Sequence, residues 1–301
     1  MIKLRLFSVL KLSVFLMAAY LIYQGTKNVT QGFTVTAIDQ NIPLSTKPSS
    51  ISPEVSQRLA QPFYYFGAGG QSYVFLGKDQ KTILKFFKKN HGLSDKSVMG
   101  VQALFPSSLA PYRKKFLPTR DERFNSIFTG CKIAYDHLKE ETKILYLHLD
   151  PEALPIPSVT IVDPMGIAHT IPLETTSFLV QERAQPFFPR LKQMIRAGKI
   201  DDAKASIHSL LTYLVTQCRK GIRDCDNGLR RNYGFFGSDV ALIDTGSLTL
   251  DPSVADPLEL KKEVTRKSHR IERWLQGNYP SLLPYYQQEL ENMTSSDIIS
   301  S

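Results

Sequence analysis

The spacing of apolar residues changes once along the chain, close to residue 182, and this change constrains the fold more than any other feature of the sequence. Before it, short runs of aromatic and β-branched residues are separated by turn residues, which is typical of strands. After it, apolar residues recur at intervals of three and four, which is typical of helices that pack through one face. The succession predicts an α+β protein with a strand-rich lobe and a helical lobe, divided between Gln181 and Pro186.

The individual elements follow from the same pattern. The strand-rich lobe is expected to contain one long helix, over 120–141. The clearest helix of the second lobe covers 203–218, and Gly221 just beyond it suits a helix end. Strands are predicted around a glycine cluster in 63–74 and at 73–76, 82–87, 144–149, 158–162, 167–173 and 178–181, and further helices at 258–276 and 282–292.

Composition limits the class of protein. The 301 residues suffice for one large domain or two small ones. A hydrophobic fraction of 42% with 22% charged residues excludes wholesale disorder, a fibrous repeat and a multi-pass membrane protein. The three cysteines form no CxxC pair, so free thiols are expected. The net charge of +9 favours phosphate-bearing ligands, nucleic acid or an anionic membrane surface, without choosing among them.

Residues 1–24 are predicted to be a hydrophobic anchor or a signal. Lys3 and Arg5 precede an apolar run over 6–23, which would rise about 27 Å as a helix and nearly span a bilayer core. Because 18–20 offers only a poor cleavage site, we expect an uncleaved single-pass anchor, with a cleaved signal peptide or a buried helix as alternatives. The basic residues would keep the N-terminus in the cytoplasm.

The remaining boundaries come from composition. Residues 25–60 are rich in Thr, Ser, Gln and Pro without a sustained period, and we expect a flexible linker there. The lobes are expected at 61–185 and 186–293. A polar, disordered tail over 294–301 would follow them.

A glycine-rich segment, Gly67-Ala68-Gly69-Gly70-Gln71-Ser72-Tyr73-Val74, fits the pattern GxGxxGxV with serine at the third glycine. The strand, turn and strand predicted after it argue against a dinucleotide-binding fold, which requires a helix there, and no Walker lysine follows. The segment is therefore either a plain hairpin turn or a loop whose backbone N–H groups cover phosphates.

Lys85 stands inside an apolar strand, Ile83-Leu84-Lys85-Phe86-Phe87. Strand alternation places it on the same face as Ile83 and Phe87. It is either an edge-strand lysine that opposes aggregation or, in a nucleotide site, a point charge on phosphate oxygens.

Acidic and amide residues gather after the 203–218 helix. Asp224, Asp226 and Asn232 lie in a turn-rich stretch, and an apolar strand over 240–243 ends in Asp244-Thr245-Gly246. A carboxylate at a strand end with an amide oxygen suits magnesium, which takes one or two such oxygens beside phosphates and water. For each residue alone, a solvated turn or a cap is the alternative.

Taken in order, the glycine segment, Lys85, the helix and the acidic residues resemble the protein-kinase-like superfamily over about 63–246. The resemblance implies a two-lobed kinase-like fold that binds ATP and magnesium. The residues implied at the nucleotide are Gly67, Gly69 and Gly70 over the phosphates, Val74 on adenine, Lys85 on phosphate oxygens, and Glu182 and Ala184 in a hinge over 181–184.

The same resemblance implies the catalytic groups. Asp226 would orient and deprotonate the acceptor hydroxyl, while Asn232 and Asp244 would hold magnesium. The sequence departs from the family because the catalytic-loop histidine is absent and five residues rather than four separate Asp226 from Asn232. Asp224 is the alternative base.

Further departures concern the segments around these groups. Asp-Thr-Gly replaces the family's Asp-Phe-Gly, no Ala-Pro-Glu follows, and only 55 residues remain after Gly246, so a conventional activation segment is not expected. Glu122 is the first choice for the acidic partner of Lys85, and Asp136 is the second.

The sequence thus predicts an ATP- and magnesium-dependent, membrane-tethered phosphotransferase whose acceptor is a protein, a sugar or a lipid head group. The alternatives are a catalytically inactive pseudokinase-like binding module and a membrane-anchored structural domain. Nucleic-acid binding is not expected, because the aromatic residues follow strand patterns. Neither HExxH nor Gly-x-Ser-x-Gly occurs, which disfavours a zinc hydrolase and a serine esterase.

Overall fold

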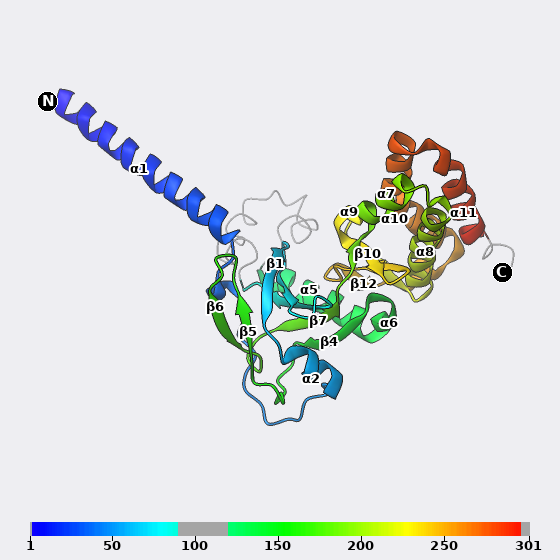
Figure 1. The fold of residues 1–301 in the computed structure, drawn as a ribbon, viewed down its shortest axis with the longest axis horizontal. Coiled ribbons are helices and arrows are strands. Elements are labelled where there is room, and N and C mark those ends of the chain that lie inside the picture. The colour runs from blue at the N-terminus through cyan, green and yellow to red at the C-terminus, as the bar shows by residue number, and fades with distance from the viewer. Residues whose placement is uncertain (1, 90–119, 296–301) are drawn as a thin grey trace, which may run out of the picture. The chain divides into compact units, whose positions relative to one another are not determined.

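The computed structural model describes residues 2–89 and 120–295 and has a mixed α+β fold (Figure 1). The contacts between residues divide the chain into two compact units. Unit 1 consists of Met1–Asn90 and His148–Phe178, and unit 2 of His91–Leu147 and Leu179–Ser301. Each unit is therefore built from two separate segments, whereas the sequence predicted two consecutive lobes at 61–185 and 186–293.

Seven strands form one sheet in the order β4-β7-β3-β2-β1-β5-β6. Strands β1, β2 and β3 are consecutive antiparallel neighbours, while β5 pairs with β1 in parallel. The strands predicted from 73–76 onwards agree with the structure within one residue at each end. The bounds are Phe63–Ala68 (β1), Ser72–Gly77 (β2), Thr82–Phe87 (β3), Ile144–His148 (β4), Ser158–Val162 (β5), Ala168–Pro172 (β6) and Phe178–Glu182 (β7).

Residues 25–60, predicted to be a flexible linker, belong to unit 1; after the end of α1 they pack against the rest of that unit. Phe33 lies edge-on to Tyr73 at 4.9 Å between ring centres, and Ile38 and Ile42 are buried. The Asp39 N–H donates to the Phe87 carbonyl at the end of β3 (2.8 Å). A short helix, α2 (Pro53–Leu59), follows and buries two more apolar residues. Burial of a few apolar side chains therefore holds this largely polar segment against the rest of the unit.

Helix α1 covers Ile2–Thr30 and is longer than the predicted apolar run. None of the described helices combines the length and the apolar character that crossing a membrane requires. The anchor at 1–24 stays a prediction. More than half of the surface is exposed for each of Val14, Phe15, Leu16, Met17, Tyr20, Leu21 and Ile22 of α1.

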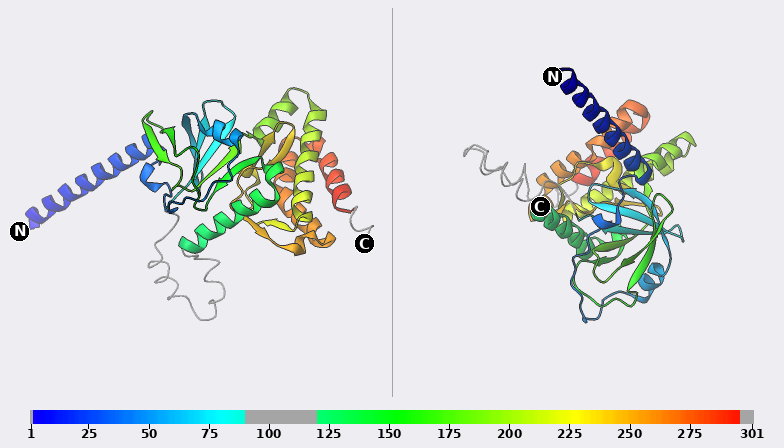
Figure 2. Two further views of the ribbon diagram at one scale, coloured as in Figure 1. Left: turned by 90° about the horizontal axis from the view of Figure 1, so that it is seen from below. Right: turned by 90° about the vertical axis from the view of Figure 1, so that its left-hand side faces the viewer.

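Helices form most of the core of unit 2. Helices α8 (Ile200–Arg219), α10 (Pro257–Asn278) and α11 (Leu283–Ser295) pack against one another and are the yellow-green, orange and red helices of Figure 2. Gly221, with φ of +67°, follows the end of α8 as expected, because glycine adopts this conformation without strain. The three predicted helices are confirmed within three residues at each end. The last residues of the predicted tail, 296–301, lie outside the described part.

Unit 2 also contains two small sheets of short strands. Strands β11 (Asp239–Leu242), β10 (Tyr233–Phe236) and β8 (Gln185–Pro186) form one small sheet, and β9 (Ile222–Asp224) pairs with β12 (Leu248–Leu250). The helix predicted at 120–141 is confirmed as two pieces, α5 (Arg120–His137), which packs against β12, and α6 (Lys139–Thr142).

Two helices of unit 2 were not predicted, α7 (Phe187–Arg196) and α9 (Leu229–Asn232). The proline at position 189 obscured α7, although it lies in the first turn, where a helix tolerates proline. Helix α9 is a single turn and too short to show a period.

Candidate functional site

The glycine-rich segment forms the β1–β2 hairpin of unit 1. Gly67 lies opposite Val74 after a β-bulge, and the Gly69 N–H donates to the Ser72 carbonyl (2.9 Å). In the described chain, Gly67, Gly69 and Gly70 do not have positive φ. A Cβ at Gly67 or Gly70 would meet no described atom within 4 Å. The hairpin itself therefore does not require these glycines, and the backbone is open to close approach by a ligand.

Lys88 braces this hairpin and was not identified from the sequence. Its Nζ donates to the Gly69 carbonyl (2.6 Å) and lies 4.6 Å from the centre of the Tyr73 ring. Burial lowers the pKa of Lys88, because the charged form loses water. Only the pairing of β2 with β3 brings this lysine to the loop, so no local signal could have found it.

Lys85 lies on β3 directly opposite Val74 of β2 and is half-buried. Its predicted acidic partner was Glu122 or Asp136. The Glu122 side chain lies outside the described residues. Asp136 is about half exposed, and its carboxylate lies 4.0 Å from the Lys132 ammonium on the same helix, α5. The partner of Lys85 in a nucleotide site stays a prediction.

Asp224 is fully buried in unit 2 at the end of β9. Its carboxylate accepts hydrogen bonds from the Ser247 hydroxyl (2.6 Å) and the Asp226 N–H (3.0 Å). It also forms an ion pair with Lys267, which is itself buried on α10 and donates to the Asp226 carbonyl. A buried carboxylate whose two oxygens are both engaged holds the loop in place and is badly situated to meet an acceptor.

Lys267 is the main residue that the sequence analysis missed. Lys267 lies at a position that continues the apolar stripe of α10, so the sequence indicates that its side chain is buried. A buried lysine requires an acidic partner, and this requirement could have led to it. Arg266 beside it donates to the Asp224 carbonyl (2.8 Å) and contacts the Asn227 side chain. Helix α10 therefore fixes the backbone from 224 to 227. The buried members of the stripe are Leu260, Val264, Lys267, Ile271 and Leu275.

Asp226, in contrast, is exposed. Its Oδ1 accepts a hydrogen bond from the Gly228 N–H (2.8 Å), and its Oδ2 accepts one from the Asn232 side-chain amide (2.7 Å). A Cβ on Gly228 would lie 3.1 Å from both carboxylate oxygens, so glycine makes room for this turn. The carboxylate is thus oriented by the protein and still accessible, as a general base must be.

Asn232 and Asp244 are brought together by the backbone. The Ile243 N–H donates to the Asn232 carbonyl (2.6 Å), and Asp244 follows as an exposed residue just beyond β11. The contact to Asp226 engages the Asn232 nitrogen and not its side-chain oxygen. The backbone at residues 243 and 244 therefore lies next to that of Asn232, and the pairing of the two side chains on a metal stays a prediction.

Helix α5 holds the Asp-Thr-Gly segment from one side. The buried Thr245 hydroxyl donates to the Cys131 thiol sulfur (3.6 Å). A Cβ on Gly130 would come within 2.7 Å of the Thr245 carbonyl oxygen and 2.8 Å of the Gly246 carbonyl carbon. This close approach requires glycine at position 130, which the sequence analysis did not identify.

The predicted hinge residues lie in the same unit. The Glu182 N–H donates to the Lys143 carbonyl (3.0 Å). A Cβ on Gly234 would lie 2.6 Å from the Ile243 side chain and 3.0 Å from the Ala184 methyl. The hinge segment, the strand after Asn232 and the residue before Asp244 therefore converge at Gly234.

The residues at this point fit a magnesium ion. Asp244 offers an exposed carboxylate and Asn232 an amide oxygen, a donor set that magnesium accepts when phosphates and water complete the shell. Within residues 2–89 and 120–295, no three His, Cys, Asp or Glu side chains gather as a metal cluster.

No protein-family model and no curated protein sequence matches this chain. Solved structures of WbdD, a bifunctional kinase-methyltransferase, do match it. One has a TM-score of 0.34 and 16% identity, covering 73% of this chain and 43% of the WbdD chain. A complex of WbdD with a kinase inhibitor has a TM-score of 0.32 and 15% identity, covering 75% and 45%. The chain spans less than half the length of these proteins, and similarity at this level leaves the functional assignment to the side-chain geometry.

Proposed function

We propose that the chain is a kinase-like phosphotransferase that uses ATP and magnesium. The observation that carries the proposal is the arrangement in unit 2. Asp226 is exposed and accepts a hydrogen bond from Asn232, and Lys267 donates to the Asp226 carbonyl. The residue before Asp244, Ile243, is hydrogen-bonded to the Asn232 backbone. These are the parts that phosphoryl transfer requires: a base that orients the acceptor and two oxygen ligands for the metal.

Each group has a distinct task in this reaction. Asp226 accepts the proton of the acceptor hydroxyl while the acceptor oxygen bonds to the γ-phosphorus, and the bond from that phosphorus to the bridging oxygen breaks as ADP leaves. Magnesium, when held by Asn232 and Asp244, supplies positive charge to the phosphates. The remaining groups would bind the nucleotide: Gly67, Gly69, Gly70 and Lys85 its phosphates, and Val74, Glu182 and Ala184 its base.

The proposal includes attachment to a membrane through residues 1–24, supported by the basic residues before an apolar run. The acceptor is a protein, a sugar or a lipid head group, and nucleic acid is not a partner. A catalytically inactive pseudokinase-like module, which would bind nucleotide without turnover, is the alternative.

Asp244→Asn tests the metal site. The change keeps the size and one oxygen but removes the negative charge, so magnesium-dependent binding of ATP should weaken about tenfold to a hundredfold. Asp239→Asn is the matched control, because Asp239 is exposed at the start of β11 and its substitution removes the same negative charge. Binding is measured as thermal stabilisation of the full chain by ATP, with and without magnesium.

Lys85→Met tests the phosphate contact. The methionine keeps most of the stem and loses the cation, so affinity for ATP should fall more than affinity for adenosine. Lys78→Met, in the exposed turn between β2 and β3, is the control and should bind both ligands as the parent does.

The combined outcomes decide between the candidate functions. If the parent binds no magnesium–ATP, or if both site variants bind it as tightly as the parent, the site assignment fails. A parent that binds magnesium–ATP and transfers no phosphoryl group to protein, sugar or lipid acceptors supports the pseudokinase-like module.

A further inference from the structure

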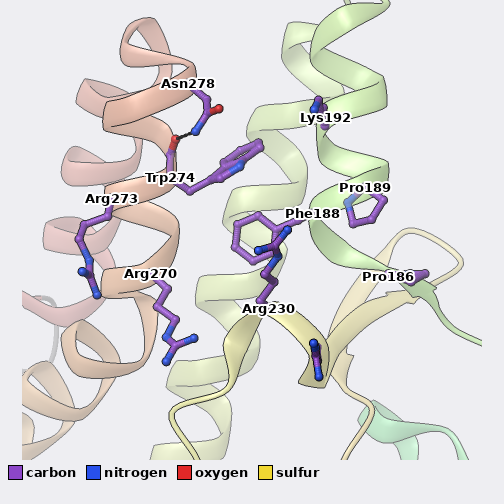
Figure 3. Close-up of a pocket in the computed structure, with 10 residues that line it drawn as sticks. Pro186, Phe188, Pro189, Lys192, Arg230, Arg270, Arg273, Trp274 and Asn278 are labelled. Atoms are coloured by element: carbon purple, nitrogen blue, oxygen red, sulfur yellow. Dashed lines mark hydrogen bonds between the residues drawn. The ribbon is translucent and has the colours of Figure 1, made fainter. Parts of the chain in front are cut away.

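A cavity of about 880 Å³ lies in unit 2 and is lined by residues of α7, α9 and α10 (Figure 3). In the close-up, Trp274 reaches from α10 toward Phe188 of α7, and Arg270 and Arg273 follow one another along α10. No acidic side chain is among the described residues that line the cavity. Its main lining residues are Lys192 of α7, Arg230 and Arg231 of α9, and Arg270, Arg273 and Trp274 of α10.

The basic side chains around this cavity lack acidic partners among the described residues, whereas those earlier on α10 have them. The earlier cations of α10 all have acidic partners: Lys261 pairs with Glu291, Lys262 with Glu259, Arg266 with Glu263 and Lys267 with Asp224. Arg270 and Arg273, and the three cations from α7 and α9, form no ion pair with any described residue. Five like charges around one hollow repel one another and create a strongly positive potential, which an anion would relieve.

The cavity is also built from the helices that position Asp226. Helix α9 carries Arg230 and Arg231 and ends in Asn232, whose side chain donates to the Asp226 carboxylate. On α10, Arg266 holds the Asp224 carbonyl, and Arg270 follows one helical turn later. A ligand bound by these arginines would therefore contact both elements that fix the Asp226 loop.

We propose that this cavity is a binding site for a phosphate-bearing ligand. A guanidinium group presents two parallel N–H donors that match phosphate oxygens, and four of the five cations are arginines. Five cations exceed the need of one phosphate and suit a ligand with several. Trp274, whose ring centre lies 5.2 Å from that of Phe188, adds an apolar wall for the carbon skeleton. The proposal does not depend on the phosphotransferase function.

The only tryptophan of the chain lines this cavity, so its fluorescence is a direct probe. We would titrate the full chain with inorganic tripolyphosphate, without ATP or magnesium and at physiological ionic strength. Sodium chloride of equal ionic strength is the control. A saturable change in Trp274 fluorescence with tripolyphosphate and none with chloride is expected. A folded parent that gives no saturable change overturns the proposal.

Two double variants of α10 separate the site from general attraction. Arg270→Gln with Arg273→Gln removes two guanidinium groups from the cavity, and affinity should fall at least about tenfold. Lys261→Gln with Lys262→Gln removes the same charge from the same helix away from the cavity, and affinity should stay at the parent value. Equal losses in both variants would overturn the proposal. If the arginine variant does not fold, as judged by circular dichroism, Arg230→Gln with Arg231→Gln replaces it.

The source of the phosphate can be a soluble metabolite or a lipid head group, and competition distinguishes them. Vesicles that contain phosphorylated phosphatidylinositol should displace tripolyphosphate if the cavity accepts a head group at a membrane, whereas phosphatidylcholine vesicles should not. Saturable binding of tripolyphosphate without displacement by either vesicle supports a soluble ligand. Magnesium–ATP stabilisation, measured on the same arginine variant, should equal that of the parent, so failure of the nucleotide site and failure of this cavity are seen separately.

Discussion

Asp224 and Asp226 are two residues apart, yet the structure gives them opposite environments. Asp226→Ala should abolish phosphoryl transfer and leave magnesium–ATP binding nearly intact, because a base acts on the acceptor. Asp224→Ala leaves Lys267 buried without its partner, which should lower the free energy of unfolding by about 3–5 kcal/mol. Urea denaturation and a transfer assay on both variants check these expectations.

A double variant isolates the buried charge at the same scale. Asp224→Leu with Lys267→Met removes both charges, so it should recover part of the stability that Asp224→Ala loses. An Asp224 variant that is as stable as the parent but inactive would contradict our assignment and move the base to Asp224.

At the scale of elements, α5 and α10 each contain a glycine whose surroundings predict opposite effects of alanine. Gly130→Ala would place a methyl within 2.7 Å of the Thr245 carbonyl oxygen, so we expect a loss of about 1–3 kcal/mol and weaker magnesium–ATP binding as the Asp-Thr-Gly segment shifts. Gly277→Ala on α10 meets no atom within 4 Å, so the helix should gain about 0.5 kcal/mol. Urea denaturation of both variants and thermal stabilisation by magnesium–ATP measure the effects. Equal stabilities would show that α5 does not press on this segment.

At the scale of the whole molecule, the N-terminal region divides into an exposed helix and a docked segment. A chain of residues 25–301 loses the exposed apolar side chains of α1, so its melting temperature should match that of the full chain. A chain of residues 43–301 also loses Phe33, Ile38 and Ile42, and its free energy of unfolding should fall by more than about 3 kcal/mol. Calorimetry of the three chains decides the matter. Equal stability of the two truncated chains would show that residues 25–42 behave as the predicted flexible linker. Flotation of the full chain and of the 25–301 chain with liposomes tests the predicted membrane anchor.

The sequence by itself determined the elements whose apolar residues repeat with a regular period. The bounds of strand β3 were predicted to the residue and those of helices α8 and α10 within three residues, because strand alternation and helical spacing record which face each element buries. The order of Gly67, Lys85, Asp226, Asn232 and Asp244 also led from sequence to a candidate nucleotide site. The predictions of elements use only residues that are near one another in the chain, whereas the predicted site rests on the order of these motifs and on the family that this order resembles.

Tertiary structure alone decided how those groups are held. The burial of Asp224 depends on Lys267, which lies 43 residues away, and the glycine hairpin is braced by Lys88, which follows the end of β3. The cavity lined by Arg230 and Arg270 likewise joins separate helices. Such contacts form between segments far apart in the chain, where the energy of pairing a buried charge or docking an apolar side chain outweighs local preference. The spacing of α10 indicates that Lys267 is buried and must be paired, but it does not say which carboxylate is the partner. The exposure of Asp226 and the burial of Asp224 could therefore be told apart only in the folded chain.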